Sequence, residues 1–197
     1  FAEQAGDVPI TILREGAEVV GAELAAPQAF STGKEFGGAT IAACCGLAVD
    51  DVVTVNHAPV VGSCGAAFVF AEVASRDALR RAGGVMAAIA DHIPIDVAGG
   101  VYLYTRDADG GADIDARMFA PLHGIAEDPA TGSATVALAA LLGTLSGSDG
   151  EARLTVRQGA DMGRPGIMST RAETRGGQPQ GAWIGGPCVP VMRGTLD

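Results

Sequence analysis

One segment constrains the fold of this chain more than any other: residues 134–142, of sequence ATVALAALL, are apolar apart from a single threonine. A helix that is apolar on all of its sides has to be buried, because a helix on a protein surface carries polar residues on its outer face. The sequence therefore predicts a buried helix over 133–145. Hydrophobic residues make up 48% of the 197 residues, which is enough to enclose such a helix and excludes a disordered chain.

The residues that lead into this helix, EDPATGS over 127–133, suit the binding of a small anion. The first N–H groups of a helix have no partner within the helix, and water cannot serve them when the helix is buried. The hydroxyl of Thr131 or Ser133 can cap one of them, and Gly132, which has no side chain, lets another group approach the backbone closely. Because a helix N-terminus also carries a partial positive charge, these residues predict a binding site for a small carboxylate.

Asp128 stands directly before this predicted carboxylate site. Pro129 restricts the backbone of Asp128 to an extended conformation, so an ionisable side chain is held at the edge of the site. We therefore predict a role for Asp128 in proton transfer and expect it to line the same cavity as Ser133. The alternative is structural: Asp128 and Thr131 would do no more than cap the helix.

Three other features could contribute to a site, and each has a simpler interpretation. The sequence Gly-Ser-Cys-Gly around Cys64 resembles a turn that carries a nucleophile but lacks the G-x-S-x-G pattern, so a buried thiol in a turn is predicted. His123 is predicted to be a surface or loop residue. Arg117 is expected to form an ion pair with Glu127 or Asp128 that supports the structure.

The charge of the chain and the absence of several motifs exclude other classes of function. The net charge of −10 argues against binding to nucleic acids or to acidic membrane surfaces, and no apolar run reaches the ~18 residues of a membrane-spanning helix. The four cysteines and three histidines lack the spacing of a metal site, and no phosphate-binding glycine motif occurs. We therefore expect no metal, nucleic-acid or membrane partner, and four buried free thiols in a reducing cytoplasm.

Strands are predicted on both sides of the central helix, and short helices before it. The predicted strands cover 8–12, 19–24, 66–73, 100–105, 113–119, 151–158, 166–174, 182–186 and 189–193, and the short helices cover 38–45, 84–92 and a stretch capped by Ser75. The last four strands follow one another with no helix between them, which favours an antiparallel or mixed sheet. The sequence thus predicts an α+β fold.

Several stretches of the sequence resemble the phenazine-biosynthesis-like (PhzF-like) isomerase family. The strongest likeness lies in RMFAP over 117–121 and GIAEDPATGSA over 124–134. MGRP over 162–165 and VPVMRGTL over 189–196 resemble the C-terminal pattern of that family. Residues 1–27 resemble the strand pair that joins its two lobes. The resemblance therefore extends over nearly the whole chain.

This resemblance implies a fold of the diaminopimelate-epimerase type. Each of its two lobes is a curved, mostly antiparallel or mixed sheet wrapped around a central apolar helix, and the active site lies between the lobes. The resemblance implies no metal or organic cofactor. It places Asp128 where related epimerases carry one of two catalytic cysteines, makes Ser133 a second catalytic residue, and assigns binding of the substrate to Thr131, Gly132 and Ser133.

The sequence departs from the family in its first lobe. The Ser-Glu-Thr motif with the catalytic glutamate and the Gly-His-Pro-Thr motif do not occur, and Ala66-Ala67 replace a usual Pro-His. The resemblance therefore implies that most of the N-terminal lobe is missing before Phe1 or comes from another chain. On this interpretation residues 1–27 and 179–197 belong to the N-terminal lobe, and residues 28–178 form the C-terminal lobe.

The function that these features imply is a cofactor-independent isomerase or epimerase that acts by proton transfer. Its substrate would be a small carboxylated, amino-bearing metabolite, and this chain would supply the carboxylate-binding half of the site and be inactive alone. The resemblance further suggests a cytoplasmic homodimer. The alternative is a non-catalytic lobe that acts as a binding or scaffolding protein and keeps the anion site.

Overall fold

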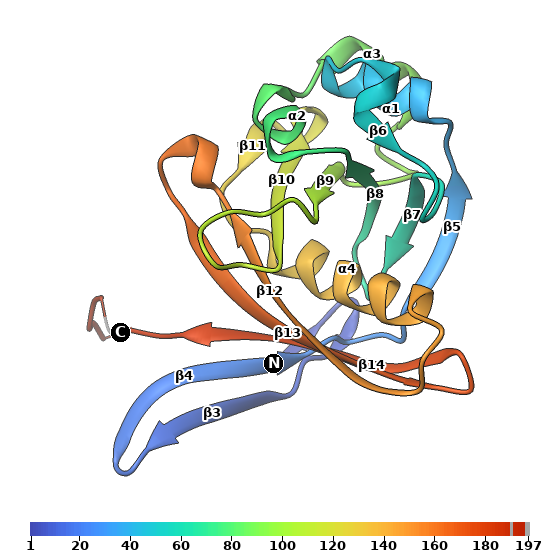
Figure 1. The fold of residues 1–197 in the computed structure, drawn as a ribbon. Coiled ribbons are helices and arrows are strands. Elements are labelled where there is room, and N and C mark those ends of the chain that lie inside the picture. Colours follow the sequence, from blue (N-terminus) through green and yellow to red (C-terminus); the bar gives the residue numbers. More distant parts are fainter. Residues whose placement is uncertain (190, 196–197) are drawn as a thin grey trace.

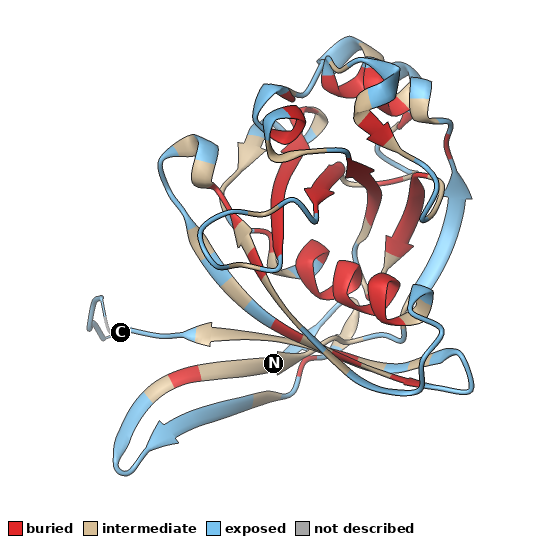
Figure 2. Ribbon diagram, in the orientation of Figure 1, coloured by how far each residue is buried: buried red, intermediate tan, exposed pale blue. Residues whose placement is uncertain are grey.

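The computed structural model describes residues 1–189 and 191–195, and its centre is the helix α4, Gly132–Leu145 (Figure 1). The prediction of a helix over 133–145 is confirmed. The residues from Ala134 to Gly143 are all buried, and Figure 2 shows the helix in the colour of buried residues, enclosed by the strands around it. Between Ala134 and Gly143 the helix α4 is therefore enclosed by protein, as its apolar sequence requires.

The other elements are short. In chain order they are β1 (Ala2–Glu3), β2 (Gly6–Asp7), β3 (Ile10–Glu15), β4 (Glu18–Ala25), β5 (Ser31–Glu35), α1 (Gly38–Cys45), the 3-10 turn η1 (Val49–Asp51), β6 (Val52–Val53), β7 (Val60–Ser63), β8 (Ala67–Val73), α2 (Arg76–Arg81), α3 (Met86–His92), β9 (Val101–Thr105), β10 (Ile114–Ala120), η2 (Pro121–His123), β11 (Ile125–Asp128), and, after α4, β12 (Gly150–Gln158), η3 (Ala160–Met162), β13 (Gly166–Arg175) and β14 (Gln178–Pro187).

Most of these strands form one long, curved sheet. Its order is β3-β4-β14-β13-β12-β10-β9-β8-β7-β5, with β11 beside β10 and β6 beside β8. Neighbouring strands are antiparallel except for the parallel pairs β8–β9 and β10–β12. The sheet bends around α4 (Figure 1). The predicted α+β fold, with a mostly antiparallel, mixed sheet around an apolar helix, is confirmed.

The central strands are covered on both faces. Phe70 of β8 and Tyr102 of β9 belong to the hydrophobic cluster around α4. Val69 and Leu103, their neighbours along the same strands, belong to a second cluster formed with α1, α2 and α3. Because successive residues of a strand point to opposite faces, this part of the molecule has three layers: α4, the sheet, and the three short helices (Figure 1).

The outer strands β3, β4 and β14 extend beyond this layered part; β3 is largely exposed, whereas β4 and β14 are mostly half-buried (Figures 1 and 2). Glu23 on β4 and Arg171 on β13 form a double hydrogen bond of 2.8 and 3.0 Å across the intervening β14. The Arg171 guanidinium also lies 3.6 Å from the ring centre of Trp183 on β14. These three side chains, which we call the Arg171 clamp, tie the N-terminal hairpin to the C-terminal strands.

Two predictions about the C-terminal strands and the cysteines need correction. The predicted strand 182–186 is part of the longer β14, and residues 189 and 191–193 form no strand, while residue 190 lies outside the described residues. Pro187 has no N–H to extend the ladder, and the pairing ends with one bond from the Cys188 N–H to the Val20 carbonyl at 3.2 Å. Cys188 is exposed, in contrast to the three other cysteines, which are buried.

The continuity of the sheet bears on the division of the chain. β14 pairs with β13 along one edge and with β4 along the other, so residues 1–27 and 179–187 are joined by hydrogen bonds to each other and to the strands around α4. The assignment of these segments to a separate lobe stays a prediction. No helix within the described residues is long and apolar enough to cross a membrane.

The central position of α4 predicts a large loss of stability when its core side chains are shortened. Leu138 is fully buried, so Leu138→Ala leaves a cavity and should lower the free energy of unfolding by about 2–5 kcal/mol. Leu145→Ala, at the exposed end of the same helix, is the matched control and should change it by less than about 0.5 kcal/mol. Urea denaturation followed by circular dichroism measures both, and equal effects of the two changes would contradict a buried α4.

The Arg171 clamp predicts a pH-dependent contribution to stability. The hydrogen bonds from Arg171 hold the pKa of Glu23 below its ordinary value in spite of partial burial. A lowered folded-state pKa stabilises the protein above the unfolded-state pKa and loses that effect as the pH falls through the folded value. Glu23→Gln should therefore cost about 1 kcal/mol at pH 7, and the difference from the wild type should vanish in acid.

The matched control for this change is Glu18→Gln, which removes the same charge from an exposed position of β4. Its stability should follow that of the wild type at every pH. A Glu23→Gln difference that stays constant between neutral and acidic pH would show that the carboxylate charge of Glu23 has no part in the effect.

Candidate active site

The N-terminus of α4 opens onto a cavity of about 530 Å³. Its walls come from β4, β14, the turn at 64–66 and the first turns of α4. Most of the lining side chains are apolar, such as Leu24, Val136 and Ile184. Among the described residues that line it, Glu3 is the one with a charged side chain and none carries a positive charge. An anion in this cavity would therefore depend on backbone N–H groups and hydroxyls for its contacts.

Gly132 and Ser133 bring the helix N-terminus to the cavity. Both line it, and Ser133 is exposed. The N-cap residue Thr131 makes no side-chain capping bond, so the prediction of a capping hydroxyl at Thr131 is wrong. A Cβ at position 132 would meet the Ile184 Cδ1 atom at 3.6 Å, which is ordinary contact distance across the cavity wall. The glycine thus keeps space open beside the first N–H groups of the helix.

Asp128 and Thr131 lie outside the lining of this cavity, contrary to the expectation for Asp128. Their side chains are bonded to each other: the Thr131 hydroxyl donates to Asp128 Oδ2 at 2.6 Å. The Asp128 side chain is half-buried at the end of β11. The structure thus brings Gly132 and Ser133 together at the cavity and pairs Asp128 with Thr131 on the chain segment just before them.

Sequence reasoning missed Gln158, the last residue of β12. Its side chain is fully buried, and its amide nitrogen donates to the Asp128 carbonyl at 2.6 Å and to the Thr131 hydroxyl at 3.0 Å. A glutamine at a strand end has no sequence signal that separates it from a surface residue. Only the parallel pairing of β10 with β12, in which Gln158 lies opposite Ala116, places it beside the segment 128–131.

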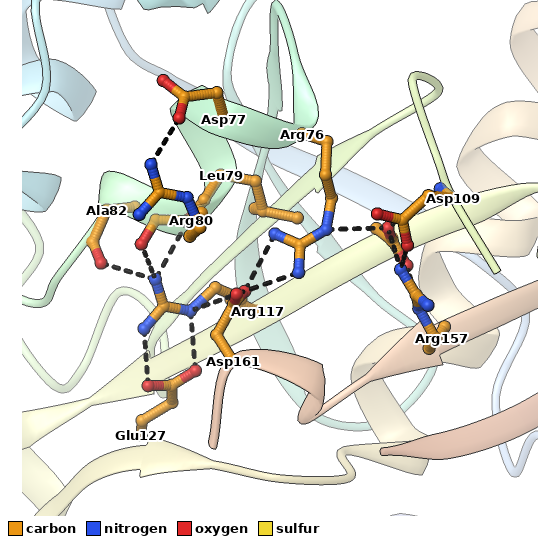
Figure 3. Close-up of polar contacts among 11 residues, drawn as sticks. Arg76, Asp77, Leu79, Arg80, Ala82, Asp109, Arg117, Glu127, Arg157 and Asp161 are labelled. Atoms are coloured by element: carbon orange, nitrogen blue, oxygen red, sulfur yellow. Dashed lines mark hydrogen bonds and ion pairs between the residues drawn. The ribbon is translucent and has the colours of Figure 1, made fainter. Parts of the chain in front are cut away.

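A cluster of ion pairs supports the other side of this segment (Figure 3). Arg117 donates to both carboxylate oxygens of Glu127 at 2.8 and 2.7 Å, which confirms the predicted pairing. Its Nη1 atom also donates to the carbonyls of Leu79, Arg80 and Ala82 at the end of α2. Arg117 therefore fixes β11, and with it the approach to Asp128, to a neighbouring helix.

Figure 3 shows that this arginine–carboxylate cluster continues to β12. Arg76 donates to both oxygens of Asp161 at 3.0 and 2.9 Å. Arg157 donates to both oxygens of the buried Asp115 at 2.6 and 2.7 Å and also pairs with Asp109. These bonds to carboxylates raise the pKa of Arg157 and of Arg76 above the ordinary value, so both stay cationic.

The weaker candidates take structural positions. Cys64 lies in a tight turn in which the Gly65 N–H donates to the Ser63 hydroxyl at 3.0 Å, and burial raises the pKa of the Cys64 thiol to about 12. A thiol with so high a pKa is a poor nucleophile at neutral pH. His123 is exposed at the end of η2 and lines a different hollow, of about 380 Å³. Both findings confirm the simpler interpretations.

Comparison with known proteins identifies the family of the chain. A family model described as phenazine biosynthesis-like protein, PhzC-PhzF, matches residues 1–194. The trans-2,3-dihydro-3-hydroxyanthranilate isomerase of Pseudomonas chlororaphis is 37% identical over 89 residues, which are 45% of this chain and 32% of that protein. An uncharacterized isomerase of Mesorhizobium japonicum is 32% identical over 161 residues, or 79% of this chain and 53% of the relative.

Solved structures agree on the fold. A PhzF-family phenazine biosynthesis protein of Bacillus anthracis superposes with a TM-score of 0.76 at 23% identity, over 93% of this chain and 62% of the other. A predicted epimerase of Pseudomonas aeruginosa gives 0.68 at 24% identity, over 91% and 59%. The chain spans between about a third and a half of the length of the two curated relatives. The match over residues 1–194, with isomerases among the relatives and PhzF proteins among the structural neighbours, shows that the chain belongs to the phenazine biosynthesis-like (PhzF) family.

Proposed function

We propose that this chain forms the carboxylate-binding part of a cofactor-independent isomerase or epimerase for a small, amino-bearing carboxylate. The observation that carries the proposal is the opening of the α4 N-terminus, at Gly132 and Ser133, onto the 530 Å³ cavity. A substrate carboxylate would accept bonds from the first helical N–H groups and from the Ser133 hydroxyl. The apolar walls would hold the carbon skeleton.

The proposed reaction moves one proton and leaves the composition of the substrate unchanged. A base removes a proton from one carbon, the electron pair of that C–H bond stays in the substrate, and an acid returns a proton to another carbon or to the opposite face of the same carbon. We assign one of these proton transfers to Asp128. Its position three residues before Thr131 and its bond to that hydroxyl support the assignment.

The second acid–base group is proposed to come from outside this sequence. The Ser-Glu-Thr and Gly-His-Pro-Thr motifs that the family resemblance leads one to expect are absent from the 197 residues. A segment or chain that carries them would close over the cavity and present its glutamate to the bound carboxylate. The chain alone then holds half of the site.

One observation favours the alternative, a lobe that binds a carboxylate without turnover. Asp128 lies outside the lining of the cavity to which Gly132 and Ser133 belong. A binding protein needs only the cavity and the helix N-terminus, whereas an isomerase also needs Asp128 to reach the substrate. The two functions are separated by proton exchange, which only the isomerase catalyses.

The proposed carboxylate site predicts how binding responds to substitutions at the helix N-terminus. Anthranilate should shift the amide NMR signals of residues 132–134, and aniline, which lacks the carboxylate, should not. Ser133→Ala should weaken anthranilate binding by about 1–3 kcal/mol, the usual value for a hydrogen bond to a charged group. Gly132→Val should abolish binding, because its branched side chain fills the space next to Ile184.

Two control variants accompany these measurements. Ser148→Ala removes a hydroxyl from an exposed position and should leave anthranilate binding unchanged. Gly132→Ala, whose methyl group meets Ile184 at ordinary contact distance, should retain part of the affinity. Equal affinity for anthranilate and aniline, or wild-type affinity in Ser133→Ala, would contradict a carboxylate site at this helix end.

The proposed half-site predicts that the isolated chain does not convert a substrate. In D₂O, the 197-residue chain should incorporate no deuterium into trans-2,3-dihydro-3-hydroxyanthranilate above the rate of buffer, because the principal base is absent. Mass spectrometry of the recovered compound measures the exchange, with a full-length isomerase of the family as the positive control. Exchange by the chain that is lost in Asp128→Asn would place the principal base within these residues.

A further inference from the structure

Gln158 makes four hydrogen bonds that leave none of its amide groups unpaired. Its nitrogen donates to the Asp128 carbonyl and to the Thr131 hydroxyl. Its oxygen Oε1 accepts from the Thr131 backbone N–H and from the Tyr102 hydroxyl, both at 3.1 Å. Because an amide has two donors and one acceptor oxygen with two lone pairs, this is its full capacity.

The orientation of the amide is set by its neighbours. A flipped amide would put its nitrogen against the Thr131 N–H, which is also a donor, and its oxygen against the Asp128 carbonyl, which is also an acceptor. Burial raises the pKa of the Tyr102 phenol, so Tyr102 keeps its single proton, which has both the Thr135 hydroxyl at 2.7 Å and Gln158 Oε1 at 3.1 Å within reach. The orientation of the amide is therefore set by the Thr131 N–H and the Asp128 carbonyl. The Gln158 nitrogen therefore has to face Asp128 and Thr131.

This orientation determines the direction of the next hydrogen bond. The Thr131 hydroxyl has a single proton, and its oxygen already accepts a bond from Gln158. Its proton is then directed to Asp128 Oδ2, 2.6 Å away. Asp128 Oδ2 therefore accepts one hydrogen bond, while no bond to Oδ1 is found among the described residues, so Oδ1 is the oxygen with both of its lone pairs open.

We propose that Gln158 is a positioning residue that directs the Thr131 proton to Asp128 Oδ2 and leaves Oδ1, with both of its lone pairs open, as the atom of Asp128 that exchanges a proton with a substrate. The inference rests on the proposed function in so far as Asp128 takes part in proton transfer. The direction of the hydrogen bonds, by contrast, follows from the contacts alone. The Gln158 side chain does not reach the substrate in this proposal and acts through Thr131.

We call the hydrogen-bonded chain from Gln158 through Thr131 to Asp128 the relay, and it lies in a buried part of the molecule. Gln158 and Thr135 are fully buried, and Thr131 is nearly so. The residues next to the relay in the chain, Glu127 and Arg157, are anchored in the arginine–carboxylate cluster (Figure 3). Side chains alternate along a strand. The cluster therefore contacts β11 and β12 on one face, through Glu127 and Arg157, while Asp128 and Gln158 point to the other face.

Carbon-detected NMR of the labelled chain tests the direction of the bond. The wild type should show a scalar coupling through the hydrogen bond between the Thr131 hydroxyl proton and Cγ of Asp128. Gln158→Glu replaces the amide nitrogen with an oxygen that competes for the same proton, so the coupling should fall by roughly twofold or more. Gln180→Glu, the same change at an exposed position, is the matched control and should leave the coupling unchanged.

Two results would overturn the proposal: a Thr131 hydroxyl proton that couples to a different acceptor in the wild type, or a coupling that survives Gln158→Glu at full size. The wild-type measurement needs no variant. It therefore decides the direction of the bond even if Gln158→Glu does not fold.

Hydrogen exchange gives a second test from the side of Gln158. Thr131→Val removes the hydroxyl and keeps the shape of the side chain, so one of the two amide protons of Gln158 loses its acceptor and should exchange with solvent about tenfold faster. The other amide proton of Gln158, which is donated to the Asp128 carbonyl, should still exchange slowly. Thr131→Ser restores the hydroxyl and should restore slow exchange of both protons.

The proposal would be refuted if each of the two Gln158 amide protons exchanged at the same rate in Thr131→Val as in Thr131→Ser. None of these measurements depends on turnover. The deuterium assay therefore tests the proposed isomerase function, whereas the scalar couplings and the exchange rates of the Gln158 amide protons test the relay.

Discussion

Burial of α4 is the constraint on which the rest of the structure depends. A helix without a polar face cannot lie against water, so the sheet has to curve around it, and β7 to β14 supply the walls. The same burial creates the chemical problem of the molecule, since the first N–H groups of the helix have no partner within it. The two sides of the helix end differ: the Thr131 N–H is paired with Gln158, and Gly132 and Ser133 lie at the cavity.

On one side the helix end faces the cavity, and on the other it faces a buried polar network. Gly132 and Ser133 leave their surroundings open, with apolar walls and no positive side chain among the described lining residues. Thr131 turns its N–H and its hydroxyl to Gln158 instead. Two adjacent parts of one helix end thus have opposite requirements. The open side can take a ligand, and the closed side holds the backbone in place while it does so.

Much of this could be predicted because it is encoded locally. The apolar run predicted α4, and Ser75 was predicted to cap α2 and accepts the Ala78 N–H at 3.1 Å. Arg117 was predicted to pair with Glu127 or Asp128, and it pairs with Glu127, ten positions away. Each of these depends on residues close in sequence. The cavity-facing role of Ser133 also followed from the buried helix end.

What could not be predicted depends on pairings between distant segments. Gln158 and Asp128 are 30 positions apart in the sequence. The parallel pairing of β10 with β12 brings them together, and no turn motif in the sequence predicts that pairing. The Thr131 hydroxyl accepts from Gln158 and donates to Asp128, so it does not cap the helix. No sequence motif marks this buried glutamine.

The Arg171 clamp also has a consequence for the order in which the molecule forms. Glu23 and Arg171 are separated by 148 positions, and β4 pairs along its outer side with β3 and along its inner side with β14. During synthesis the hairpin β3–β4 is made well before β14, so the inner edge of β4 has no partner until the chain has grown through β14. Contacts of such sequence separation slow folding, and a free strand edge invites pairing with other chains. The hairpin β3–β4 is therefore open to misassembly for as long as β14 is lacking, and that exposure ends when β14 pairs with β4.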